Sequence, residues 1–134
     1  MMRTKLFISL LVVALMPGME LYAHHSFAAT YVLEKEKIKT VEGKLVQIML
    51  RNPHSFLTVE VADENGQTKK WFIEGKGATQ ARNYGGKRPL AVGDYIKVTF
   101  NPARLTESSR GRLVSIVRPS DGWSWGLGTG EVVD

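Results

Sequence analysis

The sequence contains no cysteine, so neither a disulfide nor a thiolate metal site can contribute to its structure. It has one long apolar run, residues 6–16, and no second stretch long enough to cross a membrane as a helix. It also lacks the HExxH pattern of zinc hydrolases and the glycine-rich phosphate loop of nucleotide-binding proteins. Stability must therefore come from the hydrophobic core, which favours a compact β-barrel or β-sandwich.

Charge of one sign is not concentrated anywhere in the chain. The formal net charge is +5, but the basic residues are interspersed with acids, as in residues 34–37. A nucleic-acid-binding surface needs a concentrated basic stripe with interleaved aromatic residues. We therefore expect a solvated surface and no nucleic-acid partner.

The first 23 residues have the three zones of a secretory signal peptide. Arg3 and Lys5 precede the apolar run, Pro17 interrupts it, and Ala23 suits the position before a cleavage site. The run is about 11 residues long, short of the roughly 20 that a membrane-spanning helix needs. We expect cleavage after Ala23, a periplasmic or secreted mature protein of about 110 residues and no membrane contact after cleavage. The alternative is an uncleaved membrane anchor; a lipoprotein is disfavoured because no cysteine follows the run.

Alternating apolar and polar residues predict five strands, over residues 40–50, 56–62, 67–74, 95–101 and 112–118. Asn65-Gly66 is a strong hairpin signal between the second and third strands, and Gly43 indicates a bulge or sharp bend in the first. One short helix is expected over residues 78–84. Three strands, a helix and two strands, with a bent first strand, predict an all-β, five-stranded OB-like barrel. An open β-sandwich is the alternative.

These expectations divide the chain into four parts. A signal peptide spans residues 1–23, an amino-terminal arm 24–39, the barrel domain 40–119 and a glycine- and tryptophan-rich tail 120–134. We expect the tail to be extended or mobile.

Four short motifs carry a resemblance to a known family. They are His-His-Ser-Phe at residues 24–27, Asn-Pro-His at 52–54, Trp-Phe-Ile-Glu at 71–74 and Leu-x-x-Gly-Asp at 90–94. Together they resemble the DUF6152 family of small exported bacterial proteins. The resemblance implies export and one β-rich domain, and it supplies no activity. The sequence departs from the family pattern at residues 75–78, where the family usually has a Ser-Pro-Asn-like helix start, so a pocket shaped by that loop would differ here.

All three histidines of the chain lie in two of these motifs. Cleavage after Ala23 would give His24 a free α-amino group, which can chelate a metal ion together with its own imidazole. His54 could supply a third nitrogen and His25 a further one, and such nitrogen-rich sets favour copper(II). Glu74 is a candidate acceptor that orients an imidazole. The alternative is structural: a histidine pair in a loose arm and a turn histidine bonded to the backbone.

Trp123 and Trp125 occupy alternate positions in the tail, so an extended backbone would place both on one face. They are candidates for contact with a ligand or partner, or they seal one end of the barrel.

Three functions remain open: a copper-binding module, a metal-free module for a small ligand or an unknown periplasmic partner, and an enzyme. The enzyme, for instance a copper-dependent oxidoreductase, ranks last, because three nitrogen ligands do not by themselves make a catalyst. No nucleophile motif or triad spacing is present in the sequence, and no residue is assigned a catalytic role.

Overall fold

The computed structural model describes residues 27–78 and 89–126. Residues 27–30 are helical, and a separate compact unit begins at Tyr31. None of the helices within these ranges is long and apolar enough to cross a membrane. The elements of the second unit are η1 (Lys35–Lys37, a 3₁₀ turn), β1 (Lys39–Met49), β2 (Phe56–Ala62), β3 (Thr68–Glu74), β4 (Tyr95–Pro102), β5 (Arg110–Arg118) and β6 (Trp123–Gly126).

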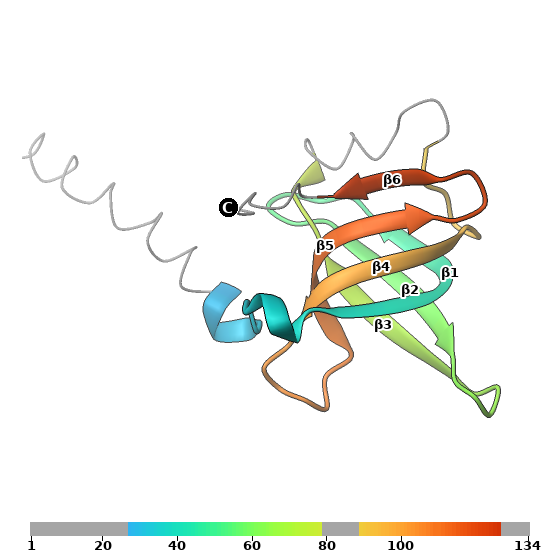
Figure 1. Cartoon of the computed structure of the whole chain (residues 1–134). Helices are drawn as coiled ribbons and strands as arrows, with labels where there is room; N and C mark the ends of the chain where they lie inside the picture. Colours follow the sequence, from blue (N-terminus) through green and yellow to red (C-terminus); the bar gives the residue numbers. More distant parts are fainter. Residues whose placement is uncertain (1–26, 79–88, 127–134) are drawn as a thin grey trace, which may run out of the picture. The chain divides into compact units, whose positions relative to one another are not determined.

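Five of the strands close into a barrel (Figure 1). Antiparallel pairings join the strands in the order β3-β2-β1-β4-β5, and a parallel pairing of β3 with β5 closes the circle. Phe72 to Glu74 pair there with Arg110 to Arg112. This closure is the arrangement of an OB-type barrel. It confirms the predicted fold class, and an open sandwich, the alternative, has no such closure.

Strand β1 belongs to both halves of the barrel because it changes partner along its length. Its first half pairs with β4, its second half pairs with β2, and Lys44 pairs with both. The register then shifts between Leu45 and Gln47, as at a β-bulge. Gly43 stands one residue before the change of partner, where an added Cβ would lie 2.2 Å from the Glu60 carbonyl oxygen. A glycine is needed there because the backbones of β1 and β2 approach so closely.

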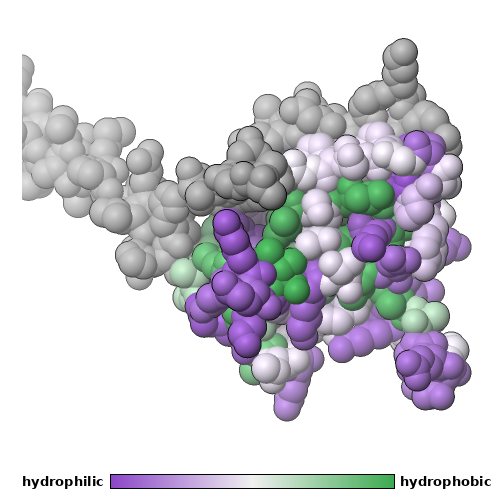
Figure 2. All heavy atoms as spheres, viewed as in Figure 1, coloured by the Kyte–Doolittle hydropathy of each residue, from purple (hydrophilic) through white to green (hydrophobic). Residues whose placement is uncertain are grey.

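The core consists of the inward-facing residues of all five barrel strands. Alternation in β2 buries Leu57 and Val59, and the same pattern in β4 buries Ile96, Val98 and Phe100. On the face shown in Figure 2, hydrophobic side chains appear as separate patches bordered by hydrophilic ones. The buried cluster comprises Leu45, Leu57, Val59, Ile73, Leu90, Ile96, Val98, Phe100, Leu113 and Ile116.

The β2–β3 hairpin follows the sequence closely. Strand β2 has the predicted bounds, and Gly66 is the one residue of the turn with a positive φ, 77°, a conformation that favours glycine. The Asp63 carboxylate accepts hydrogen bonds from the backbone N–H groups of Asn65 and Gln67, which holds the turn.

One strand was not expected from the sequence, and one expected helix lies mostly outside the described residues. A sixth strand, β6, lies in the segment expected to be a tail, where Trp123 to Gly126 pair with Arg118 to Ser115 of β5. Residues 123–126 form a strand because they pair with β5, whereas four residues are too few to show a periodic pattern in the sequence. The predicted helix over residues 78–84 lies outside the described residues, except for Ala78, which is helical.

Candidate functional site

His54 and Glu74 lie side by side at one end of the β2–β3 hairpin. Glu74 ends β3, and its backbone pairs with Phe56, so the turn that carries His54 sits beside it. The His54 Nδ1 is 2.8 Å from Glu74 Oε1. About a third of the His54 side chain is exposed, whereas Glu74 is mostly buried. Because a carboxylate can only accept, the proton of this contact belongs to Nδ1.

The Asn52-Pro53-His54 turn is fixed by its neighbours, and its Asn52–Pro53 peptide is cis. The Asn52 side-chain oxygen accepts a hydrogen bond of 2.9 Å from the Ala78 backbone N–H. A Cβ at Gly77 would lie 2.8 Å from both that oxygen and the Pro53 carbonyl oxygen. The glycine of this loop therefore allows the turn to pack tightly against it.

Ser55 joins the same turn to the loop after β3 from the other side. Its backbone N–H donates to the Lys76 carbonyl at 2.9 Å, and its carbonyl accepts from Gly75 N–H at 2.8 Å. Its hydroxyl is within 3.3 Å of both the N–H and the carbonyl of Arg51. With its backbone bonded on both sides, the turn presents His54 in a set position.

Tyr31 is the third member of the site, and its hydroxyl donates a hydrogen bond to Glu74 Oε2. Its ring is buried, and its backbone forms an isolated bridge with Ala103 after β4. Burial, and then the hydrogen bond to Glu74, raise the pKa of Tyr31 well above its ordinary value, while Arg110 acts in the opposite direction. The phenol therefore stays protonated and continues to donate to Glu74.

The Glu74 carboxylate thus accepts one hydrogen bond on each oxygen, from Tyr31 and from His54. This arrangement fixes the ring plane of His54 and makes Nε2 the nitrogen that can act as a base or a metal ligand. Within residues 27–78 and 89–126, no three histidine, aspartate or glutamate side chains lie together as a metal site. A site of three such side chains that includes His54 would therefore need at least one of them from outside these ranges.

The other residues predicted for a site fall in two places. His24 and His25 lie outside the described residues. Trp123 and Trp125 lie at alternate positions of β6, are partly buried and pack against the core cluster. The guanidinium of Arg118 stands 5.4 Å from the centre of the Trp123 ring.

Tyr31 and Arg110 were not predicted as site residues. Tyr31 reads in the sequence only as an aromatic anchor of the arm, four residues after Phe27. Its partner Glu74 is 43 positions away, and no local pattern links the two. A buried tyrosine hydroxyl usually finds a hydrogen-bond partner, which is the one signal that could have suggested an acceptor for it.

The family model described as a family of unknown function, DUF6152, matches residues 12–112. The chain belongs to this family. The matched range contains the whole His54–Glu74–Tyr31 site, whereas most of β5 and all of β6 lie beyond it. Comparisons with curated proteins and with solved structures gave no match.

Replacing Tyr31 with phenylalanine tests the buried contact with Glu74. Because the folded chain holds the phenol proton more tightly than the unfolded chain, Tyr31 contributes full stability below the ordinary tyrosine pKa of about 10. That contribution declines as pH rises above 10 toward the higher pKa of the folded state. In a pH titration followed by tyrosinate absorbance, we expect part of the absorbance change to occur at a pH well above the ordinary tyrosine pKa. This part of the change should be absent from Tyr31→Phe, and its persistence in the variant would contradict the assignment.

Proposed function

We propose that the chain is an exported binding protein that holds a copper ion through His54 and the amino-terminal histidine of its mature form. One observation carries the proposal: the 2.8 Å contact between His54 Nδ1 and Glu74 Oε1. Metal-binding histidines commonly donate their second ring N–H to a carboxylate, which sets the tautomer and makes the other nitrogen a stronger ligand. The ligand atom would be His54 Nε2.

The remaining ligands would come from the arm. Cleavage after Ala23 would place an α-amino group and an imidazole on the same residue, His24, with His25 next to it. Seven residues lead from His24 to Tyr31, a length that spans at most about 25 Å. Amine and imidazole nitrogens suit copper(II) better than the harder divalent cations, and a chain without cysteine offers no thiolate alternative.

Copper titration of the mature form tests the proposal. A protein that begins with authentic His24 should bind one equivalent of copper(II) with a nitrogen-rich electron paramagnetic resonance signature. Both His54→Ala and a form with one extra residue before His24 should lose the tight site. Glu74→Gln should weaken binding by roughly 10- to 100-fold, because it removes the oriented carboxylate but no ligand.

The extended form is the matched control, because its barrel is unchanged and only its amino group is displaced. Circular dichroism establishes that His54→Ala and Glu74→Gln remain folded. Equally weak copper binding by all forms would refute the copper site and leave a metal-free binding module as the function to pursue. The mass of protein recovered from the periplasm separately tests export and cleavage after Ala23.

A further inference from the structure

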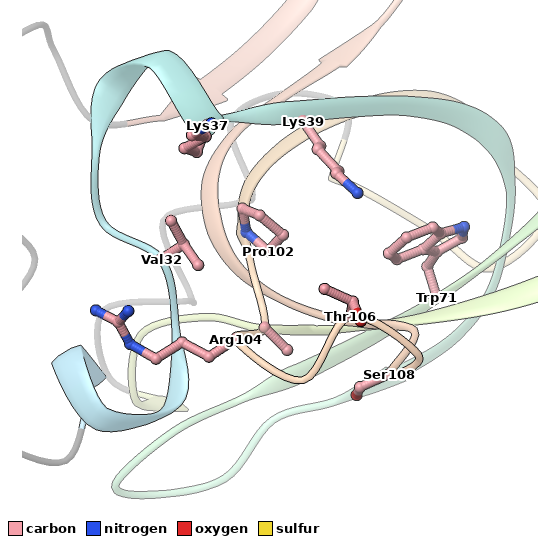
Figure 3. Close-up of a pocket in the computed structure, with 9 residues that line it drawn as sticks. Val32, Lys37, Lys39, Trp71, Pro102, Arg104, Thr106 and Ser108 are labelled. Atoms are coloured by element: carbon pink, nitrogen blue, oxygen red, sulfur yellow. The ribbon is translucent and has the colours of Figure 1, made fainter.

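A cavity of about 250 Å³ lies between the start of β1, Trp71 of β3 and the connection from β4 to β5 (Figure 3). Its volume is just below the range of pockets for drug-sized molecules, so it suits a smaller ligand. It is lined by Val32, Lys37, Lys39, Trp71, Pro102, Ala103, Arg104, Thr106 and Ser108.

The cavity has an apolar wall with a fixed aromatic ring. Its apolar lining residues are Val32, Trp71, Pro102 and Ala103. The Trp71 ring packs against Phe100 in the core, with ring centres 5.0 Å apart, and Lys69 stands 4.9 Å from its ring centre. A ring held in this way offers a preorganised surface to a flat or branched apolar group.

The charge around the cavity has one sign. Among the described residues that line it, the charged ones are Lys37, Lys39 and Arg104, and all three are basic. In Figure 3 the Lys39 side chain reaches into the space toward Trp71 and Thr106, whereas Arg104 extends away. Across the described part of the chain, neither Lys37 nor Lys39 forms an ion pair with an acid. An anion at Lys39 would therefore meet no competing carboxylate among the described residues of the lining.

We propose that this cavity binds a small organic carboxylate, whose apolar body lies on Trp71 and whose carboxylate lies at Lys39. Apolar walls with one inward-pointing cation favour such a ligand over inorganic phosphate, which prefers clustered backbone N–H groups or arginines. Thr106, toward which Lys39 points in Figure 3, adds a hydroxyl that can donate a hydrogen bond to a carboxylate there. Neither His54 nor Glu74 lines this cavity, and the inference does not depend on the proposed function.

The test compares the binding of phenylacetate with that of its neutral isostere phenylacetamide. Nuclear magnetic resonance of isotope-labelled protein detects the binding. Phenylacetate should cause saturable shifts at the Thr106 and Ser108 amides and at the Trp71 indole N–H. Phenylacetamide should bind about fivefold more weakly, because it lacks the charge that faces Lys39. Lys39→Met keeps the aliphatic stem of the side chain but removes its charge. It should lower the affinity for phenylacetate to that for phenylacetamide.

Lys70→Met is the matched control, since Lys70 is an exposed lysine next to Trp71 that does not line the cavity. It should leave the affinity for phenylacetate unchanged. The proposal would be overturned if phenylacetate gave no saturable shift, if acid and amide bound equally, or if Lys39→Met had no effect. Equal binding of inorganic phosphate would reduce the site to a general basic patch and overturn it as well.

Discussion

Replacing Gly43 with alanine is expected to destabilise the barrel by about 3 kcal/mol or more. The new Cβ would lie 2.2 Å from the carbonyl oxygen of Glu60 and 3.0 Å from a methyl group of Val61. The first neighbour is backbone, so β2 itself would have to move, and with it the pairing that β1 makes beyond Lys44. Urea unfolding followed by circular dichroism measures the loss as a lower midpoint.

Gly66→Ala is the control for this experiment. Gly66 has a φ of 77° and no atom within 4 Å of an added Cβ, so alanine there meets backbone strain but no collision. That strain is expected to cost about 1 kcal/mol. If Gly43→Ala destabilised the protein no more than Gly66→Ala, the close approach of β1 and β2 would not be a constraint on the fold.

The second large effect is expected from Arg118→Met, which should lower the Tm by roughly 15 °C. The Arg118 side chain is only 3% exposed. It donates to Asp94 at 2.7 Å, to both carboxylate oxygens of Asp121 at 3.0 and 2.9 Å, and to the Pro89 carbonyl at 3.2 Å. Hydrogen bonds to Asp121, and then to Asp94, raise the pKa of Arg118 above its ordinary value, so it stays charged. Removing the cation leaves two partly buried carboxylates without their main partner.

Arg118→Lys distinguishes the charge from the geometry. Lysine keeps the positive charge but cannot donate hydrogen bonds to both oxygens of Asp121 and to Asp94 at the same time. An intermediate Tm is therefore expected. Scanning calorimetry measures both variants. A Tm for Arg118→Met within a few degrees of the wild-type value would show that Arg118 does not clamp the turn before β4 to the end of β5.

Much of the barrel could be predicted because its signals are local. The alternation of residues 56–62 gave β2 at its observed bounds, and Asn65-Gly66 located the hairpin. Strand β5 begins at Arg110, two residues before its predicted start, because parallel pairing with β3 extends it. Strand β6 could not be predicted, since its four residues form a strand only by pairing with β5.

The candidate site was likewise predictable only in part. The motifs singled out His54 and Glu74, and the structure places them in contact. Tyr31 could not be connected to them, because only the closed barrel brings the residue before β1 to the end of β3. Trp71 packs against the core cluster and also lines the cavity, and no local sequence pattern indicates the cavity, because residues of the β4–β5 connection complete it.

The parallel pairing that closes the barrel also has a consequence for the order of folding. It joins segments about 40 residues apart, whereas β2 and β3 are joined by a tight turn and can form early. Until closure, the outer edge of β3 is open to pairing with another chain, which is the usual start of aggregation. Lys69 and Lys70 lie on β3 before the residues that pair with β5, and both are exposed. We expect their charges to disfavour such pairing until the barrel closes.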